Sequence, residues 1–246
     1  MSDVEQLVSI VETTMKEACG VPEDGRIVAA CSGGADSVAL VHLLASSAQS
    51  KQLVGVVFVD HGLRDVGREA AASRGAAERA GVPWTGLKVT LGQGNVQAAA
   101  REARYGAMLE AIGEDSLLAT GHTMDDQAET VLQRLLRRAG SWGLGGIQPR
   151  HGRIVRPLLR ISRQRLQSLG LEFAEDPTNV TDHYQRNRLR HHVLPVLEEA
   201  CQGASEAMAA PPVAGPRHGS AELGAGWSRA GALLSNSGTL TCCCAG

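Results

Sequence analysis

The sequence predicts an α/β fold, in which helices cover both faces of a parallel β-sheet. Two observations lead to this prediction: short apolar runs alternate along the chain with longer segments of helical character, and glycine-rich polar loops separate the two kinds of segment. Parallel strands need crossover connections of this kind, and helices in them bury both faces of the sheet. The chain of 246 residues, 43% of them hydrophobic, is large enough to bury such a core.

The expected helices and strands follow one another in regular order. Residues 4–18 place apolar side chains at positions 4, 7, 8 and 11, the spacing of a helix with one buried face. Residues 65–81 are rich in alanine and charge and close on a glycine, as helices commonly end. Residues 125–140 carry acids in the first turn and arginines in the last, as the helix dipole favours. Further helices are expected at 37–48 and 95–113, and strands at 26–31, 52–60, 85–90 and 116–120.

Three polar loops directly follow expected strands. They read SGGADS at 32–37, VDHGLR at 59–64 and ATGHTMDD at 119–126. In open parallel sheets, ligands bind beyond the carboxyl ends of the strands. We therefore expect the three loops to meet at one edge of the sheet and to form an active site there.

Composition argues against several classes of protein. The formal net charge of −2 is not that of a polycation, so any contact with nucleic acid needs local basic clusters. The acidic start of the chain is unlike a secretory signal, and no apolar stretch reaches the length of about 20 residues of a membrane span. The six cysteines form no CxxC pair, so neither a zinc site nor a disulfide framework is expected. Reduced thiols and a cytoplasmic location are the corresponding expectation.

The loop CSGGADS at 31–37 has the features of a phosphate-binding loop. Gly33 and Gly34 let the backbone approach a ligand closely, and the N–H groups at the start of the next helix attract anions. Ser32 and Ser37 add hydroxyl donors. Asp36 would repel a bare phosphate, which argues for Mg²⁺ between the carboxylate and the phosphates. A pyrophosphate cradle with a metal ion is one interpretation, and a glycine-rich turn with a helix cap is the other.

Several strings of residues carry a resemblance to a known family. SGGADS after a strand resembles the signature of the PP-loop ATP pyrophosphatases, and VDHGLR at 59–64 follows it. GHTMDDQAETVLQRLLR at 121–137 comes next, and then RPLL, EDPTN and RNRLRHHVLPVLE within 156–198. Together, over about residues 26–200, they resemble the bacterial tRNA(Ile)-lysidine synthases. The resemblance implies a Rossmann-like PP-loop ATPase fold, of the adenine nucleotide alpha hydrolase-like type.

The resemblance also implies an activity. Members of this family use ATP to adenylate the wobble cytidine of a minor isoleucine tRNA with a CAU anticodon. The side-chain amine of free lysine then displaces AMP, so that the products are lysidine, pyrophosphate and AMP. The implied cofactors are ATP and Mg²⁺, and the implied partners are this tRNA and lysine, with no membrane. The oligomeric state is left open, a homodimer being one alternative.

Roles for individual residues follow from the resemblance. It implies catalytic roles for Asp36, Arg104, Asp126 and Glu129, with Asp36 and Asp126 also as metal ligands. The expected contacts to ATP are Ser32, Gly33, Gly34, Ala35, Asp36, Ser37, His61 and His122. Glu129, Arg186 and Arg190 are expected to contact the substrate lysine or the tRNA.

Without the resemblance, these acids and histidines have simpler interpretations. Asp126 and Glu129 lie three residues apart on one helical face, and acids there equally serve as ordinary charge at a helix start. His61 and His122 each follow a strand, where a histidine is often a hydrogen-bonding loop residue. No proton-transfer role is expected for either histidine.

Arginines are dense in the second half of the expected domain. Arg101 lies three residues before Arg104 on one helical face, so which of the two is catalytic is open. A basic stretch suits phosphate contacts, which carry no sequence information, and a solvated surface is the alternative. This stretch consists of Arg134, Arg137, Arg138, Arg150, Arg153 and Arg156. The glycine-rich segment 140–148 between them is expected to be mobile, as a lid near the tRNA.

The chain departs from the family pattern in two places. The segment 162–170 is about one helical turn shorter than the family usually has. From residue 201 onward, alanine, glycine, serine and proline dominate without periodicity, so disorder is expected. The expected organisation is a catalytic domain at 1–200 and a low-complexity tail at 201–246, without recognisable C-terminal tRNA-binding domains. A short form, a truncated product and a frameshifted reading are equally compatible with this tail.

Three other functions compete with lysine ligation. A related PP-loop tRNA thiolase would need cysteines near the site, and only Cys31 is near the loop. A nucleotide-binding module without catalysis would not need Asp36, Asp126 and Glu129 together. A truncated protein that binds nucleotide without ligase activity is the third alternative.

Overall fold

The computed structural model of the chain describes residues 2–60, 62, 65–89, 96–137, 145–175 and 185–210. Some of the sequence-based expectations fall outside these ranges. They concern His61, Arg138, most of the glycine-rich segment 140–148, the DPTN part of EDPTN, and the tail from residue 211 onward.

A six-stranded sheet forms the centre of the fold, with the strand order β3-β2-β1-β4-β6-β5. All neighbouring strands run parallel except β5 and β6, which pair antiparallel, so the expected parallel sheet is confirmed. The short pair β5–β6 at the sheet edge was not expected from the sequence. The strands are β1 (Arg26–Ala30), β2 (Leu53–Asp60), β3 (Trp84–Lys88), β4 (Ser116–Thr120), β5 (Arg150–His151) and β6 (Ile154–Val155).

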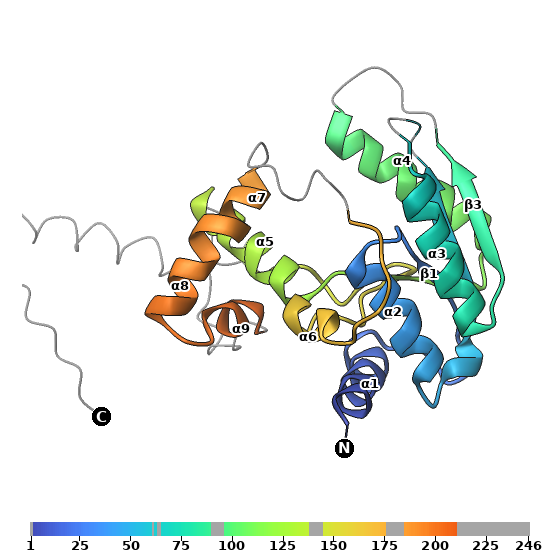
Figure 1. Cartoon of the computed structure of the whole chain (residues 1–246), viewed down its shortest axis with the longest axis horizontal. Coiled ribbons are helices and arrows are strands. Elements are labelled where there is room, and N and C mark those ends of the chain that lie inside the picture. The colour runs from blue at the N-terminus through green and yellow to red at the C-terminus, as the bar shows by residue number, and fades with distance from the viewer. Residues whose placement is uncertain are drawn as a thin grey trace, which may run out of the picture. The chain divides into compact units, whose positions relative to one another are not determined.

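Helices connect the strands and then continue beyond the sheet (Figure 1). Before the first strand lie α1 (Asp3–Thr13) and a π-helical turn at Thr14–Ala18. The connecting helices are α2 (Ala35–Ser46), α3 (Gly67–Ala80), α4 (Val96–Ala111) and α5 (Met124–Leu136), and a 3₁₀ turn lies at Ser50–Gln52. The later helices are α6 (Arg163–Gln167), α7 (Gln185–Arg188), a π-helical turn at Leu189–Val193, α8 (Leu194–Ala200) and α9 (Ala204–Ala209). Among the described residues, no helix combines the length and apolar character needed to cross a membrane.

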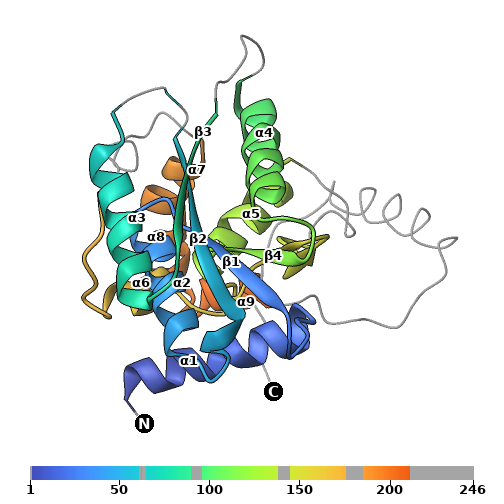
Figure 2. The ribbon, with the colours of Figure 1, turned by 90° about the vertical axis from the view of Figure 1, so that its right-hand side faces the viewer.

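Neighbouring strand residues point to opposite faces of the sheet, and each face has its own apolar core. Val56 packs into the larger core, which it shares with Leu7 of α1 and Leu40 of α2. The next residue, Val57, packs into the smaller core with Met108 of α4. Figure 2 shows α2 and α3 on one side of the sheet and α4 on the other. The period-two pattern of the strands therefore places a helical layer on each face.

The helices that follow the sheet pack around α5. Ala128 and Leu132 of α5 form a third apolar cluster with Leu189 and Leu194, and Met208 of α9 packs against it. Glu198 fixes the start of α9 by accepting the backbone N–H of Gly203 at 2.7 Å and that of Ser205 at 3.0 Å. Helical structure thus continues to Ala209, beyond the boundary at residue 200 that the composition indicated.

Truncation at two positions tests where the folded part ends. A chain that ends at Ala210 is expected to melt at the same temperature as the full chain, because residues 211–246 offer few large apolar side chains to offset the entropy of ordering them. A chain that ends at Ala200 loses α9 and its contact with α5. We expect its melting temperature to fall by about 5 °C, the shift that a loss of about 2 kcal/mol produces in a domain of this size. Equal melting temperatures for all three chains would contradict a stabilising role of α9.

Candidate active site

The loop between β1 and α2 can take only glycine at Gly33. Its φ angle is +82°, and a Cβ atom there would lie 2.2 Å from the backbone oxygen of Glu69. Gly34 is the N-cap of α2 and offers no side chain to cap the helix. The N–H groups at the start of a helix have no partner within the helix, so this end of α2 is suited to an anion.

The hydroxyl group of Ser37 stabilises this loop by hydrogen bonds to its backbone. Its Oγ donates to the backbone oxygen of Gly34 at 2.9 Å and accepts the backbone N–H of Ser32 at 3.1 Å. The hydroxyl oxygens of Ser32 and Ser37 lie 3.2 Å apart. Ser37 is 8% exposed, and its hydroxyl group is used in hydrogen bonds within the loop. The contact with ATP that the sequence indicated stays a prediction.

A capping box opens α5 and orients Asp126. Oδ2 of Asp126 accepts the backbone N–H of Thr123 at 2.8 Å, and the N–H of Asp126 donates to Thr123 Oγ1 at 3.4 Å. This reciprocal arrangement leaves Oδ1 of Asp126 to face the side chains opposite. Just before it, Gly121 allows close approach to α2, because a Cβ atom there would lie 3.1 Å from the backbone oxygen of Asp36. The two loops that follow β1 and β4 therefore meet, as the sequence predicted.

Three arginines face the three acids that the resemblance singled out. We call these side chains the acid–arginine cluster: Asp36, Asp126, Glu129, Arg163, Arg186 and Arg190. Glu129 has no exposed surface and Asp126 is 8% exposed. Buried carboxylates require partners of this kind, because an unpaired buried charge is costly.

Arg186 and Arg190 reach the acids from the start of the helical region after the sheet. Arg186 Nη2 donates to Asp126 Oδ1 at 2.7 Å, and its Nε donates to Glu129 Oε2. Arg190 Nε donates to Glu129 Oε1 at 2.6 Å. Their spacing of four residues puts both guanidinium groups on one helical face, so the structure brings together four side chains that the sequence had proposed.

Arg163 is a member of the cluster that reasoning from the sequence missed. Its Nε donates to Asp36 Oδ2 at 2.9 Å, and its Nη2 donates to Asp126 Oδ1 at 3.4 Å. Its Nη1 lies 3.9 Å from Glu129 Oε1. The available signal was weak: Arg163 is the first residue of a short helix behind the capping Ser162, in the segment that looked short for the family.

The two aspartates of the cluster have pKa values shifted in opposite directions. Burial raises the pKa of Asp36, and the nearby Arg163 only partly opposes this. Burial also acts to raise the pKa of Asp126, but Arg163, Arg186 and the N–H of Thr123 outweigh it and lower that pKa overall. Asp126 is therefore held as a carboxylate, whereas Asp36 carries its charge at a cost to the fold.

Asp36 offers an oxygen atom suited to a cation. Its Oδ1 is buried and has no hydrogen-bond partner, although Oδ2 is paired with Arg163. Both oxygens of Asp126 are already engaged by hydrogen bonds. No group of three or more metal-ligating side chains occurs among the described residues. Mg²⁺ commonly binds through one or two carboxylates together with phosphates and water, so the arrangement around Asp36 fits this ion.

His122 is held in its neutral form beside the cluster. The imidazole Nδ1 lies 2.9 Å from Thr120 Oγ1. Burial lowers the pKa of His122 to about 4, a shift that Asp126 opposes only in part. Because the folded-state pKa lies below that of the unfolded chain, this residue favours the fold above pH 6.5, and its contribution is lost as the pH falls toward about 4.

The protonation of His122 can be measured directly. We expect its Hε1 resonance to stay constant between about pH 8 and pH 5 in NMR spectra of the folded protein, because the buried imidazole does not take up a proton in this range. The signal is assigned with a His122→Gln variant, and the chain unfolded in urea provides the reference titration. A midpoint near the ordinary histidine pKa in the folded protein would show that the ring is accessible and able to carry a proton.

Arg104 packs beside Tyr105 on α4. It belongs to α4, and its Cζ atom lies 5.9 Å from the centre of the Tyr105 ring, while that of Arg101 lies 5.3 Å from the same ring. Burial lowers the pKa of Arg104, and the ring of Tyr105 opposes this. The choice between Arg101 and Arg104 as a catalytic residue therefore stays open.

Part of the basic stretch serves the fold rather than an external anion. Arg150 Nη1 donates to the backbone oxygen of Cys19 at 3.2 Å, and Arg153 Nη2 donates to that of Leu109 at 3.0 Å. Arg156 is 7% exposed. Arg150 and Arg153 thus tie the β5–β6 edge to the end of the first helical region and to α4. The sequence pattern alone did not distinguish these roles from a phosphate-binding surface.

Comparison with known proteins agrees with this architecture. The PP-loop domain family matches residues 7–197. The chain is 43% identical to a tRNA(Ile)-lysidine synthase of Salinispora arenicola (strain CNS-205), over 73% of this chain and 59% of that protein. It is 39% identical to a tRNA(Ile)-lysidine synthase of Thermobifida fusca (strain YX), over 82% of this chain and 66% of that protein. The chain thus spans less than two thirds of the length of these curated relatives.

A solved structure shows the same fold at low sequence identity. It is the U34-tRNA thiolase NcsA from Methanococcus maripaludis, with a TM-score of 0.66 and 17% identity, over 84% of this chain and 77% of that chain. At this level of identity the likeness concerns the fold alone. The match to residues 7–197 extends from α1 into α8 and includes the glycine loop and every member of the acid–arginine cluster. The chain belongs to the PP-loop domain family.

Proposed function

We propose that the protein uses ATP to join lysine to the wobble cytidine of a minor isoleucine tRNA with a CAU anticodon, forming lysidine. The names of the curated relatives support this substrate pair. The observation that carries the proposal is the acid–arginine cluster, which lies beside the glycine loop at the carboxyl edge of the sheet. Ligands of open parallel sheets bind at this edge, so it suits a reaction between phosphates, a cytidine and an ammonium group.

In the first half-reaction, the start of α2 holds the phosphates of ATP. Gly33 makes room for the backbone of Glu69, and Gly34, an N-cap without a side chain, leaves the N–H groups of the first helical turn open to the negative charge. Asp36 would hold Mg²⁺ through its unpartnered Oδ1, and the ion would supply positive charge to offset the negative charge of the phosphates. The oxygen of the cytidine carbonyl becomes a good leaving group once it carries AMP.

In the second half-reaction, the acids of α5 receive the amine of lysine. Glu129 and Asp126 provide negative charge in a buried place, which favours an ammonium group over a neutral side chain. Asp126, whose pKa is lowered, stays ionised and can therefore attract the ammonium group, although the same lowered pKa makes it a weak base for the proton of the attacking amine. Arg186 and Arg190 then become available to phosphates of the tRNA or of the adenylate.

Product analysis tests the proposal. The full chain is incubated with ATP, lysine and total tRNA, and the nucleosides are then separated and identified by mass spectrometry. We expect a nucleoside with the mass of cytidine plus lysine minus water, and only when both ATP and lysine are present. A sulfur-containing nucleoside formed with a sulfur donor would instead support thiolation, and ATP binding without any modified nucleoside would support a nucleotide-binding protein without ligase activity.

A further inference from the structure

Arg163 occupies the place at which the three acids of the site come together. Among the described residues it is the one whose guanidinium group lies within 4 Å of Asp36, Asp126 and Glu129 alike, at 2.9, 3.4 and 3.9 Å. Its side chain is 19% exposed, so solvent screens these contacts only in part. Nothing in the proposed half-reactions assigns a role to this residue.

Hydrogen bonds between the starts of α5 and α6 fix the position of Arg163. Its N–H donates to Asp125 Oδ2 at 2.7 Å, and two residues earlier the oxygen of Ile161 accepts the N–H of Met124 at 3.0 Å. The start of α6 is thus fastened to the start of α5. Because these hydrogen bonds fix the backbone at Arg163, its side chain reaches the acids in a defined geometry.

The charges of the cluster balance without any ligand. Three carboxylates face three guanidinium groups. A free divalent cation finds one carboxylate oxygen of the cluster without a partner, Oδ1 of Asp36, and there it would meet the positive charge of Arg163 at close range. To gain a second oxygen of Asp36 it would have to displace this guanidinium. A ligand that carries phosphates changes this balance, because phosphate oxygens accept paired hydrogen bonds from a guanidinium group.

We propose that Arg163 is a positioning residue that keeps Asp36 closed to free cations and releases it when the phosphates of ATP arrive. Asp36, its nearest partner, lies in the first turn of α2, where the phosphates are expected. When the guanidinium turns from Asp36 to a phosphate, Oδ2 of Asp36 joins the unpartnered Oδ1 as a cation ligand. In taking the ligand to be ATP, this inference rests on the proposed function. It predicts that the nucleotide binds before the metal ion.

The test measures cation binding without any nucleotide. Mn²⁺ alone is titrated into the full chain, and the free ion is followed by electron paramagnetic resonance. We expect Arg163→Gln to bind Mn²⁺ about tenfold or more tightly than the unchanged protein, because the neutral side chain no longer competes for the carboxylates. Arg163→Lys keeps the positive charge and is expected to bind Mn²⁺ as weakly as the unchanged protein.

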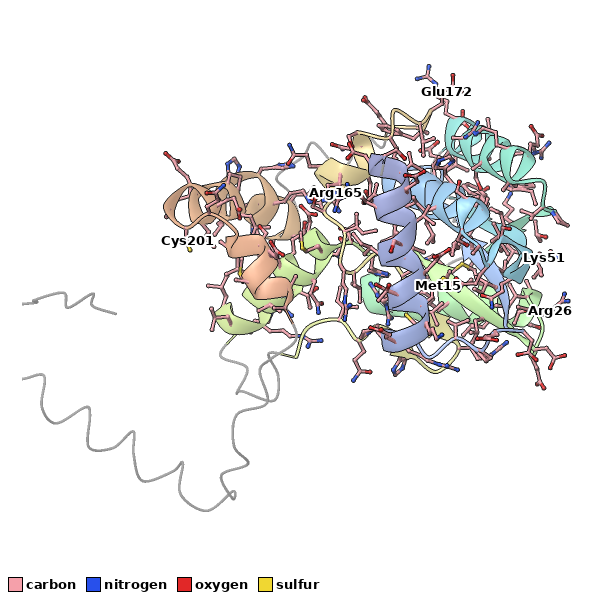
Figure 3. All side chains as sticks on the ribbon, turned by 90° about the horizontal axis from the view of Figure 1, so that it is seen from below. Met15, Arg26, Lys51, Arg165, Glu172 and Cys201 are labelled. Carbon is pink, nitrogen blue, oxygen red and sulfur yellow. The ribbon has the colours of Figure 1, made fainter. Side chains whose placement is uncertain are left out.

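Arg165→Gln is the matched control. Arg165 belongs to the same short helix, but its Nη2 donates to Gln6 Oε1 at 3.2 Å, toward α1, and Figure 3 labels it there. This variant loses the same charge from α6 without touching the cluster. It is expected to leave Mn²⁺ binding unchanged, so a gain shared by both glutamine variants would attribute the effect to overall charge and overturn the proposal.

Two further results decide the matter. Equal Mn²⁺ affinities of folded Arg163→Gln and the unchanged protein would overturn the inference. If Arg163→Gln does not fold, the melting temperature of the unchanged protein provides the test. Millimolar Mg²⁺ alone is expected to leave this temperature constant. If Mg²⁺ alone stabilised the protein as much as Mg²⁺ with a non-hydrolysable ATP analogue, the proposal would be contradicted. Neither measurement uses tRNA or lysine, so failure of lysidine formation would reject the proposed function and leave this inference standing.

Discussion

Asp36→Asn is expected to abolish ATP-dependent adenylation of tRNA while the protein stays folded. The carboxylate has one oxygen on Arg163 and one without a partner, and the proposed role of the free oxygen is to hold Mg²⁺ at the phosphates. Loss of several kcal/mol of charge stabilisation in the transition state corresponds to about a thousandfold loss in rate. The measurement is release of pyrophosphate in the presence of tRNA and ATP.

The stability of this variant separates a catalytic role from a structural one. Burial raises the pKa of Asp36, so its charged form disfavours the fold at neutral pH. That cost declines once the pH falls below the folded-state pKa and is gone below the pKa of the unfolded chain. Asparagine removes the cost and keeps an oxygen for Arg163, so the melting temperature at neutral pH is expected to stay close to that of the unchanged protein. Asp24→Asn, at an exposed aspartate, is the control for the substitution itself. Pyrophosphate release at a near-normal rate in Asp36→Asn would remove Asp36 from the mechanism.

Glu129→Gln is expected to separate the two half-reactions. Adenylation of tRNA should continue, whereas use of lysine should become poor, with KM for lysine raised about a hundredfold because the ammonium group loses its charged partner. Glu129 has no exposed surface, and its oxygens accept from Arg186 and Arg190. Glutamine keeps the shape but leaves the two arginines with less negative charge, so the melting temperature is expected to fall as well.

Two separate assays check this prediction. The first follows pyrophosphate release without lysine, and the second follows formation of the modified nucleoside over a range of lysine concentrations. Glu199→Gln, at an exposed glutamate, is the control and should leave both unchanged. An unchanged lysine requirement in Glu129→Gln would show that another acid, in the first place Asp126, holds the ammonium group.

The spacing of the acids along the chain explains why their proximity in the candidate site was predictable. Asp126 and Glu129 lie on one face of a helix because of their spacing, and the loop at Asp36 follows a strand of the same parallel sheet. Both facts are local, since helical and strand periodicity can be read from a few residues. The meeting of these loops then follows from the geometry of parallel sheets. The order of strands and helices through α5 was predictable for the same reason.

Other features depend on contacts between distant parts of the chain. Arg163 lies 127 positions from Asp36 in the sequence, so no local pattern reveals their ion pair. The arginines of the β5–β6 edge look equally suited to bind phosphate in the sequence, and only the fold turns Arg150 and Arg153 toward backbone oxygens. The helix α9 lies in a segment whose composition suggests no structure, yet it packs on α5 through Met208.

The sequence by itself determined the layered α/β fold, because the periodicity of strands and helices is short-range. It also predicted a phosphate-binding role for the glycine loop and, through the family resemblance, the three acids of the candidate site. Only the tertiary structure decided how these acids are charged and which side chains hold them. Burial raises the pKa of Asp36, whereas two arginines from separate helices lower that of Asp126. Burial and ion pairing depend on neighbours that folding brings together from far along the chain, and these neighbours set the state of the site before any ligand binds.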